Sequence, residues 1–366
     1  MTQLNRLQLQ HFRNAAHIQC QLSPGLNLFI GDNAAGKTSL IEAIWLLATG
    51  RSFRTRQAQH LIQHNQAQTT IFAEVCSSLH PERVNRIGMQ RQNGTMSLRL
   101  NGESVRSQSE IAQQIPVQLL TPESHRLLEE GPKARRQFMD WGCFYQFPEF
   151  IQYWRQHKRI LKQRNHALKK RLPAAQVQLW DQHLVATSEH IDQMRRNYLQ
   201  ALTPFLEEFC LALMPELNET VHCHYRSGWP KATEDLLQLM QQNLAKDLQL
   251  GHTQYGSHRA DIRFKFGTQE AMQILSRGQQ KLFVCALMLA QAKLHQKVAE
   301  EPVIMLIDDL PAELDEFHRL KLLQLLRELG IQHLVTSTAL GLIPVLDKNT
   351  SKAWKIEQGT LSELEI

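Results

Sequence analysis

A short loop containing two glycines carries the clearest chemistry in the sequence. Residues 31–38 read Gly-Asp-Asn-Ala-Ala-Gly-Lys-Thr and fit the pattern G-x-x-x-x-G-K-[ST]. The backbone N–H groups of such a loop turn toward phosphate oxygens, and the following helix adds the positive end of its dipole. We expect Lys37 to reach the β- and γ-phosphates and the Thr38 hydroxyl to ligate Mg²⁺. The predicted nucleotide contacts are Gly31, Asp32, Asn33, Ala34, Ala35, Gly36, Lys37, Thr38 and Ser39.

The flanks of the loop favour this interpretation over an ordinary strand–helix turn. Residues 26–30 are a short apolar run typical of a strand. After the loop, apolar residues recur on one face of a helix that Gly50 could cap. They are Leu40, Ile41, Ile44, Leu47 and Ala48.

Two adjacent carboxylates follow a second apolar run. Residues 303–307 are all apolar, which is typical of a strand buried on both faces of a parallel sheet, and Asp308 and Asp309 come directly after them. Ligands of open α/β sheets lie beyond the carboxyl ends of the strands. We expect Asp308 to hold Mg²⁺, directly or through water, and Asp309 to polarise the attacking water. The alternative, two aspartates that end a strand in solvent, is disfavoured by the phosphate loop. The catalytic residues are thus predicted to be Lys37 and Asp309, and the metal ligands Thr38 and Asp308.

A third motif, Leu275-Ser-Arg-Gly-Gln279, precedes an apolar helix. Ser276 stands at an N-cap position, and Gly278 permits close approach to the backbone. A helix start of this kind is a second surface for phosphate, although an ordinary capped helix is the alternative. The predicted contacts are Ser276, Arg277, Gly278 and Gln279.

The three motifs together resemble those of ABC ATPases, where L-S-G-G-Q is the signature. Residues 312–315 resemble the D-loop of the same superfamily, with Asp315 as a further nucleotide contact. In ABC ATPases the signature caps the nucleotide held by a partner subunit. Since this chain has one phosphate loop and one signature, the resemblance implies a head-to-tail homodimer that encloses two ATP molecules and opens on hydrolysis. A switch histidine is usual after the last core strand. Val335-Thr-Ser-Thr338 stands there instead, so Ser337 or Thr338 is expected to substitute and hydrolysis to be slow.

The elements that must position these motifs fall into three segments. Strand-like runs dominate the first ~120 residues, helical patterns rich in Leu, Gln, Arg and Glu follow to about residue 250, and alternating helix and strand patterns then return. The prediction is an α/β fold, an ABC-type P-loop ATPase head with an inserted mainly helical lobe. Residues 1–121 and 255–366 are predicted to form the two halves of the ATPase lobe, and residues 122–254 the helical lobe. The strand-like runs are residues 4–9, 17–22, 26–30, 69–75, 117–120, 262–266, 303–307 and 333–336, and a helix is expected at 319–329.

Composition narrows the class of protein further. The net charge of +6 favours an anionic partner without naming one. The longest unbroken apolar run has nine residues, 282–290, about half of what spans a bilayer. With no secretion signal recognisable, we expect a cytoplasmic protein without a membrane partner. The six cysteines form no C-x-x-C pair, so neither a zinc ribbon nor a thioredoxin motif is indicated.

Several segments make the chain more similar to the RecF family than to ABC ATPases at large. In order they cover essentially the whole sequence. Three departures from the family pattern stand out: Ala34 replaces a usual glycine, Ser257 replaces a usual proline, and Pro311-Ala312 alters the approach to the D-loop. The segments are Phe12-Arg-Asn14, Gly50-Arg-Ser-Phe-Arg54, residues 122–136 with Phe138-Met-Asp140, residues 255–261, the signature, and residues 308–315.

The resemblance to the RecF family implies function as well as fold. Arg13 would lie near the nucleotide phosphates, and Gln118 would be the glutamine that senses metal and water. ATP and Mg²⁺ would be the cofactors of a weak, DNA-stimulated ATPase that binds double-stranded and gapped DNA without sequence preference. With RecR and RecO, a protein of this family helps RecA replace single-strand-binding protein during recombinational repair.

A basic stretch is the best candidate for DNA contact. No acidic residue occurs between Glu149 and Asp181, and eight basic residues do, among them Arg164. A phosphate backbone is a natural partner for such a stretch, and a solvated helix face is the alternative. The candidate contacts are Lys158, Arg159 and Lys162, with Arg135 and Arg136 as a second pair.

Three other classes of nucleotide-binding protein fit less well. An SMC-like structural ATPase would insert a long coiled coil, whereas this insert of ~130 residues is too short for a long rod. A transporter ATP-binding subunit would need a surface that couples to a membrane partner and would lack the basic helical lobe. A GTPase would carry N-K-x-D, which is absent from the sequence.

Overall fold

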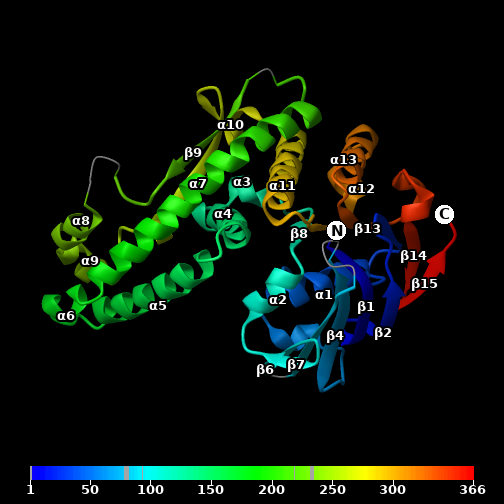
Figure 1. Cartoon of the computed structure of the whole chain (residues 1–366), viewed down its shortest axis with the longest axis horizontal. Helices are drawn as coiled ribbons and strands as arrows, with labels where there is room; N and C mark the ends of the chain where they lie inside the picture. The colour runs from blue at the N-terminus through cyan, green and yellow to red at the C-terminus, as the bar shows by residue number, and fades with distance from the viewer. Residues whose placement is uncertain (1, 78–81, 93, 218, 231–234) are drawn as a thin grey trace. The chain divides into compact units, whose positions relative to one another are not determined.

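A computed structural model shows the chain folded into two compact units. It describes residues 2–77, 82–92, 94–217, 219–230 and 235–366. Unit 1 contains residues 1–124 and 281–366, and unit 2 contains residues 125–280 (Figure 1). The second division falls at 281, not at 255 as the sequence predicted. The reason is that β10 (Asp261–Phe266) pairs with β9 (Val221–Arg226), so the segment before the signature belongs to unit 2.

The central sheet of unit 1 is parallel except for its edge strand. Its order is β15-β14-β3-β13-β12-β8, which places the strands of the two predicted phosphate-site motifs on either side of β13. Every residue of β3 and β12 is buried, as expected for strands covered on both faces. The strands are β3 (Leu26–Ile30), β8 (Val117–Leu120), β12 (Ile304–Ile307), β13 (Gln332–Ser337), β14 (Lys352–Glu357) and the antiparallel β15 (Thr360–Leu364).

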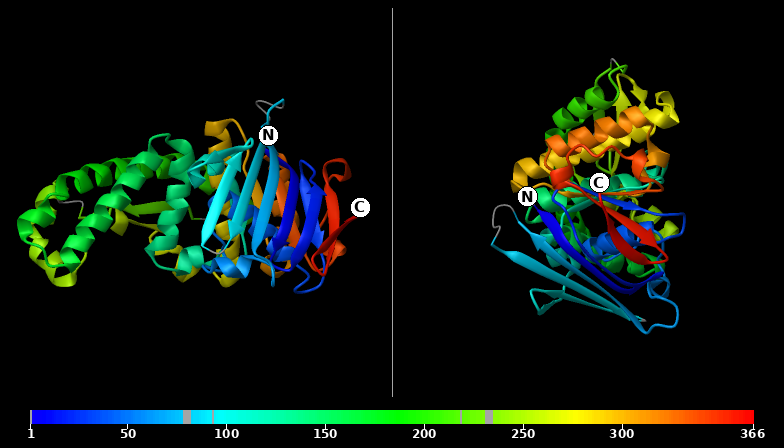
Figure 2. Two further views of the ribbon diagram at one scale, coloured as in Figure 1. Left: turned by 90° about the horizontal axis from the view of Figure 1, so that it is seen from below. Right: turned by 90° about the vertical axis from the view of Figure 1, so that its right-hand side faces the viewer.

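A second, antiparallel sheet of unit 1 has the order β2-β1-β4-β5-β6-β7 (Figure 2). Its β4 alternates buried and half-buried residues along its whole length, the period of a strand with one covered face. The sequence predicted β1, β2 and β4 but not β5 to β7, whose exposed faces carry many polar residues. The strands are β1 (Gln3–Phe12), β2 (Ala15–Gln21), β4 (Gln68–Cys76), β5 (Val84–Gln92), β6 (Thr95–Leu100) and β7 (Glu103–Val105).

Helix α1 (Lys37–Thr49) joins the cores of the two sheets. One hydrophobic cluster contains Leu40 and Ile44 of α1 together with Ile71 of the antiparallel sheet and Leu334 of the parallel sheet. Because α1 is buried on several sides, its first residues are held firmly beside the end of β3. The remaining helices of unit 1 are α2 (Gln108–Gln114), α12 (Leu310–Glu313), α13 (Glu316–Glu328) and most of α11 (Arg277–Ala299).

Unit 2 is mainly helical, as predicted for the insert. Helices α5 (Phe150–Lys169) and α7 (Asp181–Leu213) run alongside each other (Figure 1). A three-stranded sheet of order β11-β10-β9 packs against α7 and α4. Gly142 of α4 lets that helix approach α7, because a Cβ at this position would lie 2.0 Å from the ring of Tyr198. The other elements are α3 (Arg126–Glu129), α4 (Pro132–Gln146), α6 (Ala174–Gln178), α8 (Leu236–Gln242), α9 (Leu244–Leu250), α10 (Ala271–Ile274) and β11 (Gln269–Glu270).

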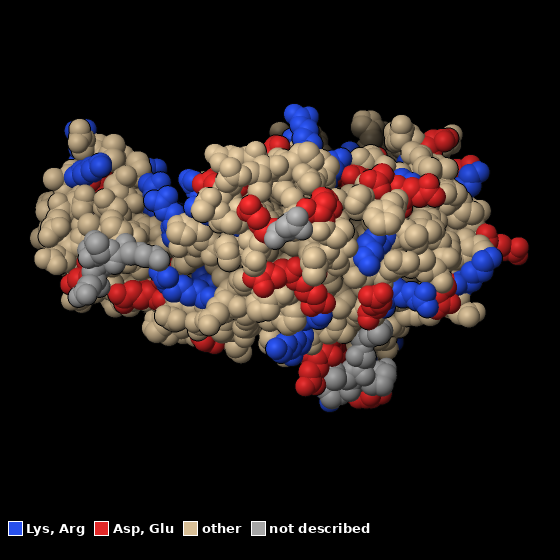
Figure 3. Space-filling model, turned by 90° about the horizontal axis from the view of Figure 1, so that it is seen from above, with Lys and Arg blue, Asp and Glu red and all other residues tan. Residues whose placement is uncertain are grey.

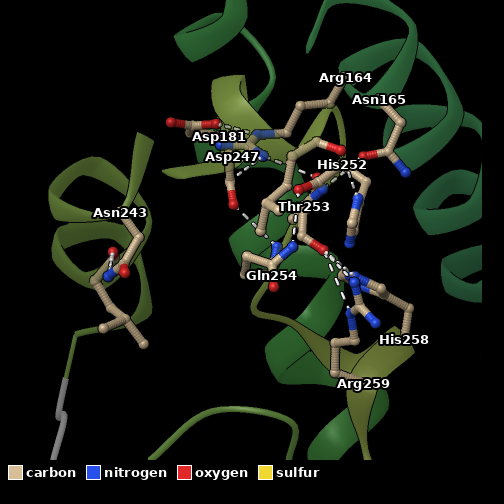
Figure 4. Close-up of polar contacts among 12 residues, drawn as sticks. Arg164, Asn165, Asp181, Asn243, Asp247, His252, Thr253, Gln254, His258 and Arg259 are labelled. Atoms are coloured by element: carbon tan, nitrogen blue, oxygen red, sulfur yellow. Dashed lines mark hydrogen bonds and ion pairs between the residues drawn. The ribbon is translucent and has the colours of Figure 1, made fainter. Parts of the chain in front are cut away.

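A buried ion cluster ties the helices of unit 2 together. The Arg164 guanidinium, fully buried on α5, donates to Asp181 at 2.8 Å, to Asp247 at 2.7 Å and to the Thr253 hydroxyl at 2.8 Å (Figure 4). These partners come from α7, α9 and the segment that follows α9. The sequence counted Arg164 in the basic stretch, which was wrong for this residue. Its side chain is buried and paired with two aspartates, so it is not available to a DNA phosphate.

Two histidines of unit 2, the buried His157 and the half-buried His258, are held in their neutral form. His157 lies 3.3 Å from the hydroxyls of both Thr187 and Ser257, and burial, with His258 and Arg195 nearby, lowers its pKa to about 3. Burial likewise lowers the pKa of His258 to about 4, although the carbonyl of Thr253 at 3.2 Å opposes the shift. Both side chains therefore resist protonation as long as unit 2 stays folded.

We predict that unit 2 loses stability on mild acidification. Below pH 6.5 the unfolded chain binds protons at His157 and His258 while the folded chain does not, so the free energy of unfolding falls as the pH falls toward 4. Each histidine should cost about 1.4 kcal/mol per pH unit across this window. Urea unfolding of His157→Gln should show a shallower pH dependence than wild type. The exposed His183→Gln is the control and should leave the slope unchanged; equal slopes for all three proteins would refute the assignment.

Candidate nucleotide-binding site

The phosphate loop adopts a backbone that its residue types make possible. It leaves β3 at Gly31 and enters α1 after Gly36, whose φ of 119° is in the left-handed range that glycine tolerates. A Cβ at Gly31 would lie 2.3 Å from the Ile356 carbonyl oxygen, so this position also requires glycine. Ala34, which replaces the glycine usual in the family, has φ 67° and bears a cost of about 1 kcal/mol for that conformation.

Side chains on both sides fasten the loop. The Asn14 amide nitrogen donates to the carbonyl oxygens of Ala35 at 3.2 Å and Ala34 at 3.4 Å. From within the loop, the Lys37 ammonium donates to the carbonyl oxygens of Gly31 at 2.6 Å and Asp32 at 2.9 Å, and the residue is buried. The positive charge of Lys37 is thus held over the turn of the loop, where the sequence places the phosphates.

Asp308 is where the two predicted halves of the site meet. Its Oδ1 accepts hydrogen bonds from the Thr38 hydroxyl at 3.0 Å and from the Thr336 hydroxyl at 2.8 Å. Burial raises the pKa of Asp308, the two hydroxyls oppose the shift, and neighbouring Asp309 adds to it. The structure therefore brings together three residues that lie 270 and 28 positions apart in sequence.

Asp309 has an unusual backbone for a non-glycine residue. Its φ of 52° and ψ of 53° are left-handed, and its N–H donates to the Thr336 hydroxyl at 2.7 Å. The side chain is half-buried and borders the same cleft as Asp308. Sequence reasoning missed Thr336, whose only signal was a hydroxyl on the strand next to the two carboxylates.

These side chains line one cleft of about 800 Å³ in unit 1. Nine of the predicted site residues border it, and so do several that the sequence did not single out. The predicted ones are Arg13, Asn33, Ala34, Gly36, Lys37, Thr38, Ser39, Asp308 and Asp309. The additional ones are Asn14, Arg54, His60, Ile62, Gln63, His64 and Thr336.

A buried carboxylate, Glu42, organises the cationic wall of the cleft. Both oxygens of this α1 residue accept from the Arg13 guanidinium, at 2.6 and 2.9 Å, and Arg54 lies 3.5 Å away. The Ser52 hydroxyl also donates to Glu42, which is fully buried. Arg13 thus borders the cleft as predicted, while Glu42 was missed. The available signal was a carboxylate in an otherwise apolar helix.

Gln118 lies in the middle of β8, before the carboxyl edge of the sheet. Its amide nitrogen donates to Gln291 of α11 at 3.0 Å, and the side chain is buried. Among the described residues that line the cleft, Gln118 does not occur. The structure therefore does not bring it to the other candidates, and its sensing role stays a prediction.

The signature forms a reciprocal cap at the start of α11. The Ser276 N–H donates to the Gln279 side chain at 3.0 Å, and the Gln279 N–H donates to the Ser276 hydroxyl at 3.3 Å. Gly278 is open, since a Cβ there would have no described atom within 4 Å, and Arg277 is exposed. These residues belong to unit 2, whereas the phosphate loop belongs to unit 1. Because the cap occupies the N–H groups of Ser276 and Gln279, an anion at this helix start would have to use those of Arg277 and Gly278.

The D-loop and switch segments also occupy defined positions in unit 1. Asp315 caps α13 by accepting from the His318 N–H at 2.9 Å, and this bond together with the His318 side chain lowers the pKa of the exposed carboxyl. At the end of β13, the Ser337 hydroxyl donates to the Ala339 carbonyl oxygen at 2.9 Å. Thr338 is exposed and borders the cleft, so of the two substitutes predicted for the switch histidine it is the one placed there.

The DNA candidates separate into two groups. Lys158, Arg159 and Lys162 are exposed on α5; Lys158 covers the Trp154 ring at 4.0 Å, and the other two border a groove of about 710 Å³. Arg135 and Arg136 are bound inside unit 2, to Asp261 at 2.8 Å and to the Ala260 carbonyl oxygen at 2.7 Å. On the face drawn in Figure 3, Lys and Arg are dispersed among Asp and Glu. The exposed group on α5 therefore stays the candidate for DNA contact, as the sequence predicted.

The donor atoms at the centre of the cleft suit a hard cation. They are the Thr38 hydroxyl and the Asp308 carboxylate, oxygen ligands of the kind that Mg²⁺ prefers.

The described part of the chain has no helix long and apolar enough to cross a membrane.

The family model and the similar sequences both indicate the same protein family. The model described as "RecF/RecN/SMC N terminal domain" matches residues 3–360. The DNA replication and repair protein RecF of Hydrogenovibrio crunogenus is 58% identical over 363 residues, covering 99% of each chain. That of Shewanella loihica is 41% identical over 364 residues, also covering 99% of each.

Solved structures agree with the sequence comparison. The structure of the recombination mediator protein RecF with ATP, in the RecFOR pathway, superposes with a TM-score of 0.87 at 25% identity, covering 99% of this chain and 98% of the other. An Smc head domain from Pyrococcus furiosus, with a TM-score of 0.60 and 16% identity over 100% and 96% of the two chains, shares the fold.

We predict that Glu42→Gln destabilises unit 1. The substitution keeps the shape of the side chain but removes the charge that Arg13 and Arg54 share, and hydrogen bonds to a charged group contribute about 1.5–3 kcal/mol. Urea unfolding should show a loss of that order. The control is Glu363→Gln, which breaks the exposed pair with Lys352 and should cost less than about 1 kcal/mol. Equal losses in the two variants would show that Glu42 does not organise the cleft.

Proposed function

The chain belongs to the RecF family of DNA replication and repair proteins, and from that premise we propose that it is an ATP-dependent DNA-binding protein of recombinational repair. The main support for the proposal is that Lys37, Thr38 and Asp308 line the same cleft. Each of these groups has the charge or the donor that a nucleoside triphosphate requires. The solved RecF structure with ATP supports ATP as the ligand.

Different residues of the cleft bind the phosphates, hold the metal and orient the water. The loop N–H groups and the start of α1 receive the phosphates, and Lys37 exchanges its carbonyl partners for β- and γ-phosphate oxygens. Thr38 and Asp308 hold Mg²⁺, which when bound neutralises charge on those oxygens. Asp309 orients a water toward the γ-phosphate and accepts its proton. Since Thr338 stands in for a switch histidine, this ATPase is weak and serves as a switch.

ATP also acts as the contact between two copies of the chain. The signature, Ser276 to Gln279, is a capped helix start at which the N–H groups of Arg277 and Gly278 would receive a γ-phosphate. By analogy with ABC ATPases, these residues and Asp315 complete the site of the partner copy, so that the homodimer forms on ATP and opens after hydrolysis. An SMC-like structural role is less well supported, because the longest helix, α7, has 33 residues and spans only about 50 Å.

The partners follow from the same family. A relative that acts as a recombination mediator in the RecFOR pathway supports RecO and RecR as partners. RecA loading at gapped DNA is the outcome that we propose from the resemblance to the family. DNA itself is bound without sequence preference through backbone phosphates, with Lys158, Arg159 and Lys162 as the contacts. Arg135 and Arg136 keep a structural role beside Asp261 and Ala260.

We predict opposite effects of two substitutions in the cleft. Lys37→Ala should abolish ATP binding, because it removes the only buried ammonium of the described phosphate loop. Asp309→Asn should bind ATP but hydrolyse it far more slowly, and should therefore accumulate as an ATP-bound dimer. Binding of a fluorescent ATP analogue and sedimentation velocity with ATP or ADP measure both effects.

The exposed Lys348→Ala is the control for the loss of a lysine and should behave as wild type. Unchanged ATP affinity in Lys37→Ala would contradict the role of the loop. An Asp309→Asn protein that stays monomeric with ATP would contradict the nucleotide-dependent dimer.

We predict that reversing the charges of Lys158, Arg159 and Lys162 to Glu weakens DNA binding. Each lost phosphate contact should lower the slope of log affinity against log salt by about 0.9. Reversal of Arg83, Arg99 and Arg106, exposed residues of unit 1, changes the net charge by the same amount and is the control. If the two triple variants lose affinity equally, DNA responds to overall charge and the α5 assignment fails.

A further inference from the structure

One hydroxyl group contacts both carboxylate residues of the cleft. Thr336 lies on β13, between the strands that carry the phosphate loop and the two aspartates, and it is fully buried. Its Oγ1 donates to Asp308 Oδ1 at 2.8 Å and accepts from the Asp309 backbone N–H at 2.7 Å. The Thr336 hydroxyl thus both donates and accepts a hydrogen bond within the site.

The two bonds fix different properties of the site. The bond to Asp308 selects which carboxylate oxygen faces β13 and leaves the rest of the carboxylate to the cleft. The bond from Asp309 supports a left-handed backbone, φ 52°, which is unfavourable for a non-glycine residue. That conformation sets the direction in which the Asp309 side chain leaves the backbone. Thr336 therefore contributes to the orientation of both aspartates, together with Thr38 at Asp308.

We propose that Thr336 is the positioning residue that holds Asp308 for the metal and Asp309 for the water, and so connects the end of β13 to the chemistry. This role rests on the proposed function. Ser337 and Thr338, the two candidates to replace the switch histidine, follow Thr336 directly, so in this proposal a displacement of either one by nucleotide or a partner is passed on to Thr336. The same displacement then moves both carboxylates together.

A merely structural role for a buried hydroxyl would have a different signature. Loss of such a group lowers the stability of the fold, and therefore the melting temperature, wherever it occurs. A positioning role should in addition change the affinity for Mg²⁺ and the rate of hydrolysis, by about 10- to 100-fold, as for other groups that orient metal ligands. The two roles are therefore separable by measurement.

The experiment compares two substitutions at Thr336 with a matched one elsewhere. Thr336→Val removes the hydroxyl and keeps the shape, and Thr336→Ser keeps the hydroxyl. Thr69→Val is the control, because Thr69 is equally buried in unit 1 and its hydroxyl donates to the Gln10 carbonyl oxygen at 2.8 Å, away from the cleft. For each protein one measures the melting temperature, the Mg²⁺ concentration that gives half of the thermal shift with ATP, and the hydrolysis rate.

We expect Thr336→Val to need at least tenfold more Mg²⁺ and to hydrolyse ATP at least tenfold more slowly. Thr336→Ser should resemble wild type, and Thr69→Val should lose stability alone. The role is refuted if Thr336→Val differs from wild type only in melting temperature, as Thr69→Val does, or if Thr336→Ser is as defective as Thr336→Val. A wild-type protein that shows no thermal shift with Mg²⁺ and ATP would instead refute the proposed function.

A double substitution tests whether Thr336 also acts through Asp309. In Asp309→Asn the backbone N–H remains but the proton acceptor is lost. Adding Thr336→Val to that variant should not slow residual hydrolysis further, while the Mg²⁺ requirement should still rise through Asp308. Fully additive losses in the hydrolysis rate would show that the two residues act independently and would overturn this part of the proposal.

Discussion

The site depends on two hydrogen bonds that Asp308 accepts, one from the Thr38 hydroxyl and one from the Thr336 hydroxyl. Thr38 follows β3, Asp308 follows β12 and Thr336 lies near the end of β13, and these strands are neighbours in the order β3-β13-β12. Parallel strands present their carboxyl ends at one edge, so pairing alone gathers residues that are distant in sequence. Burying the Asp308 carboxylate is unfavourable, and the two hydroxyls offset part of that cost while aligning the group.

The cationic wall of the cleft is organised by the same principle. Glu42 is buried on α1 and accepts hydrogen bonds from Arg13 and Arg54. The Lys37 ammonium donates to carbonyl oxygens of its own loop. Charges held in this way are oriented before a phosphate arrives, which lowers the cost of reorganisation on binding. Because α1 is wedged in the core shared by two sheets, its N-terminus is a rigid support for the loop.

Local pattern was enough to predict the strands and turns of the phosphate site. The apolar runs before Gly31 and Asp308 are strands β3 and β12, and the glycines at 31 and 36 occupy positions that reject a Cβ. The functions of Glu42 and Thr336 were not visible, because each depends on a partner brought close only by the fold. Arg164 could not be predicted as buried for the same reason. Its partners Asp181 and Asp247 are distant in sequence, and only the fold brings them to it. The division at 281 was missed because strand pairing with β9 is non-local.

Mixing two inactive proteins tests the central claim, that each ATP is held by Lys37 of one copy and the signature of the other. Lys37→Ala keeps an intact signature but binds no ATP, and Ser276→Arg binds ATP but cannot cap it. If the site is composite, a mixture contains heterodimers with one complete site, and hydrolysis should reappear at a substantial fraction of the wild-type rate. If each chain completes its own pocket, the mixture will be as inactive as its two components, and the account of the switch will be wrong.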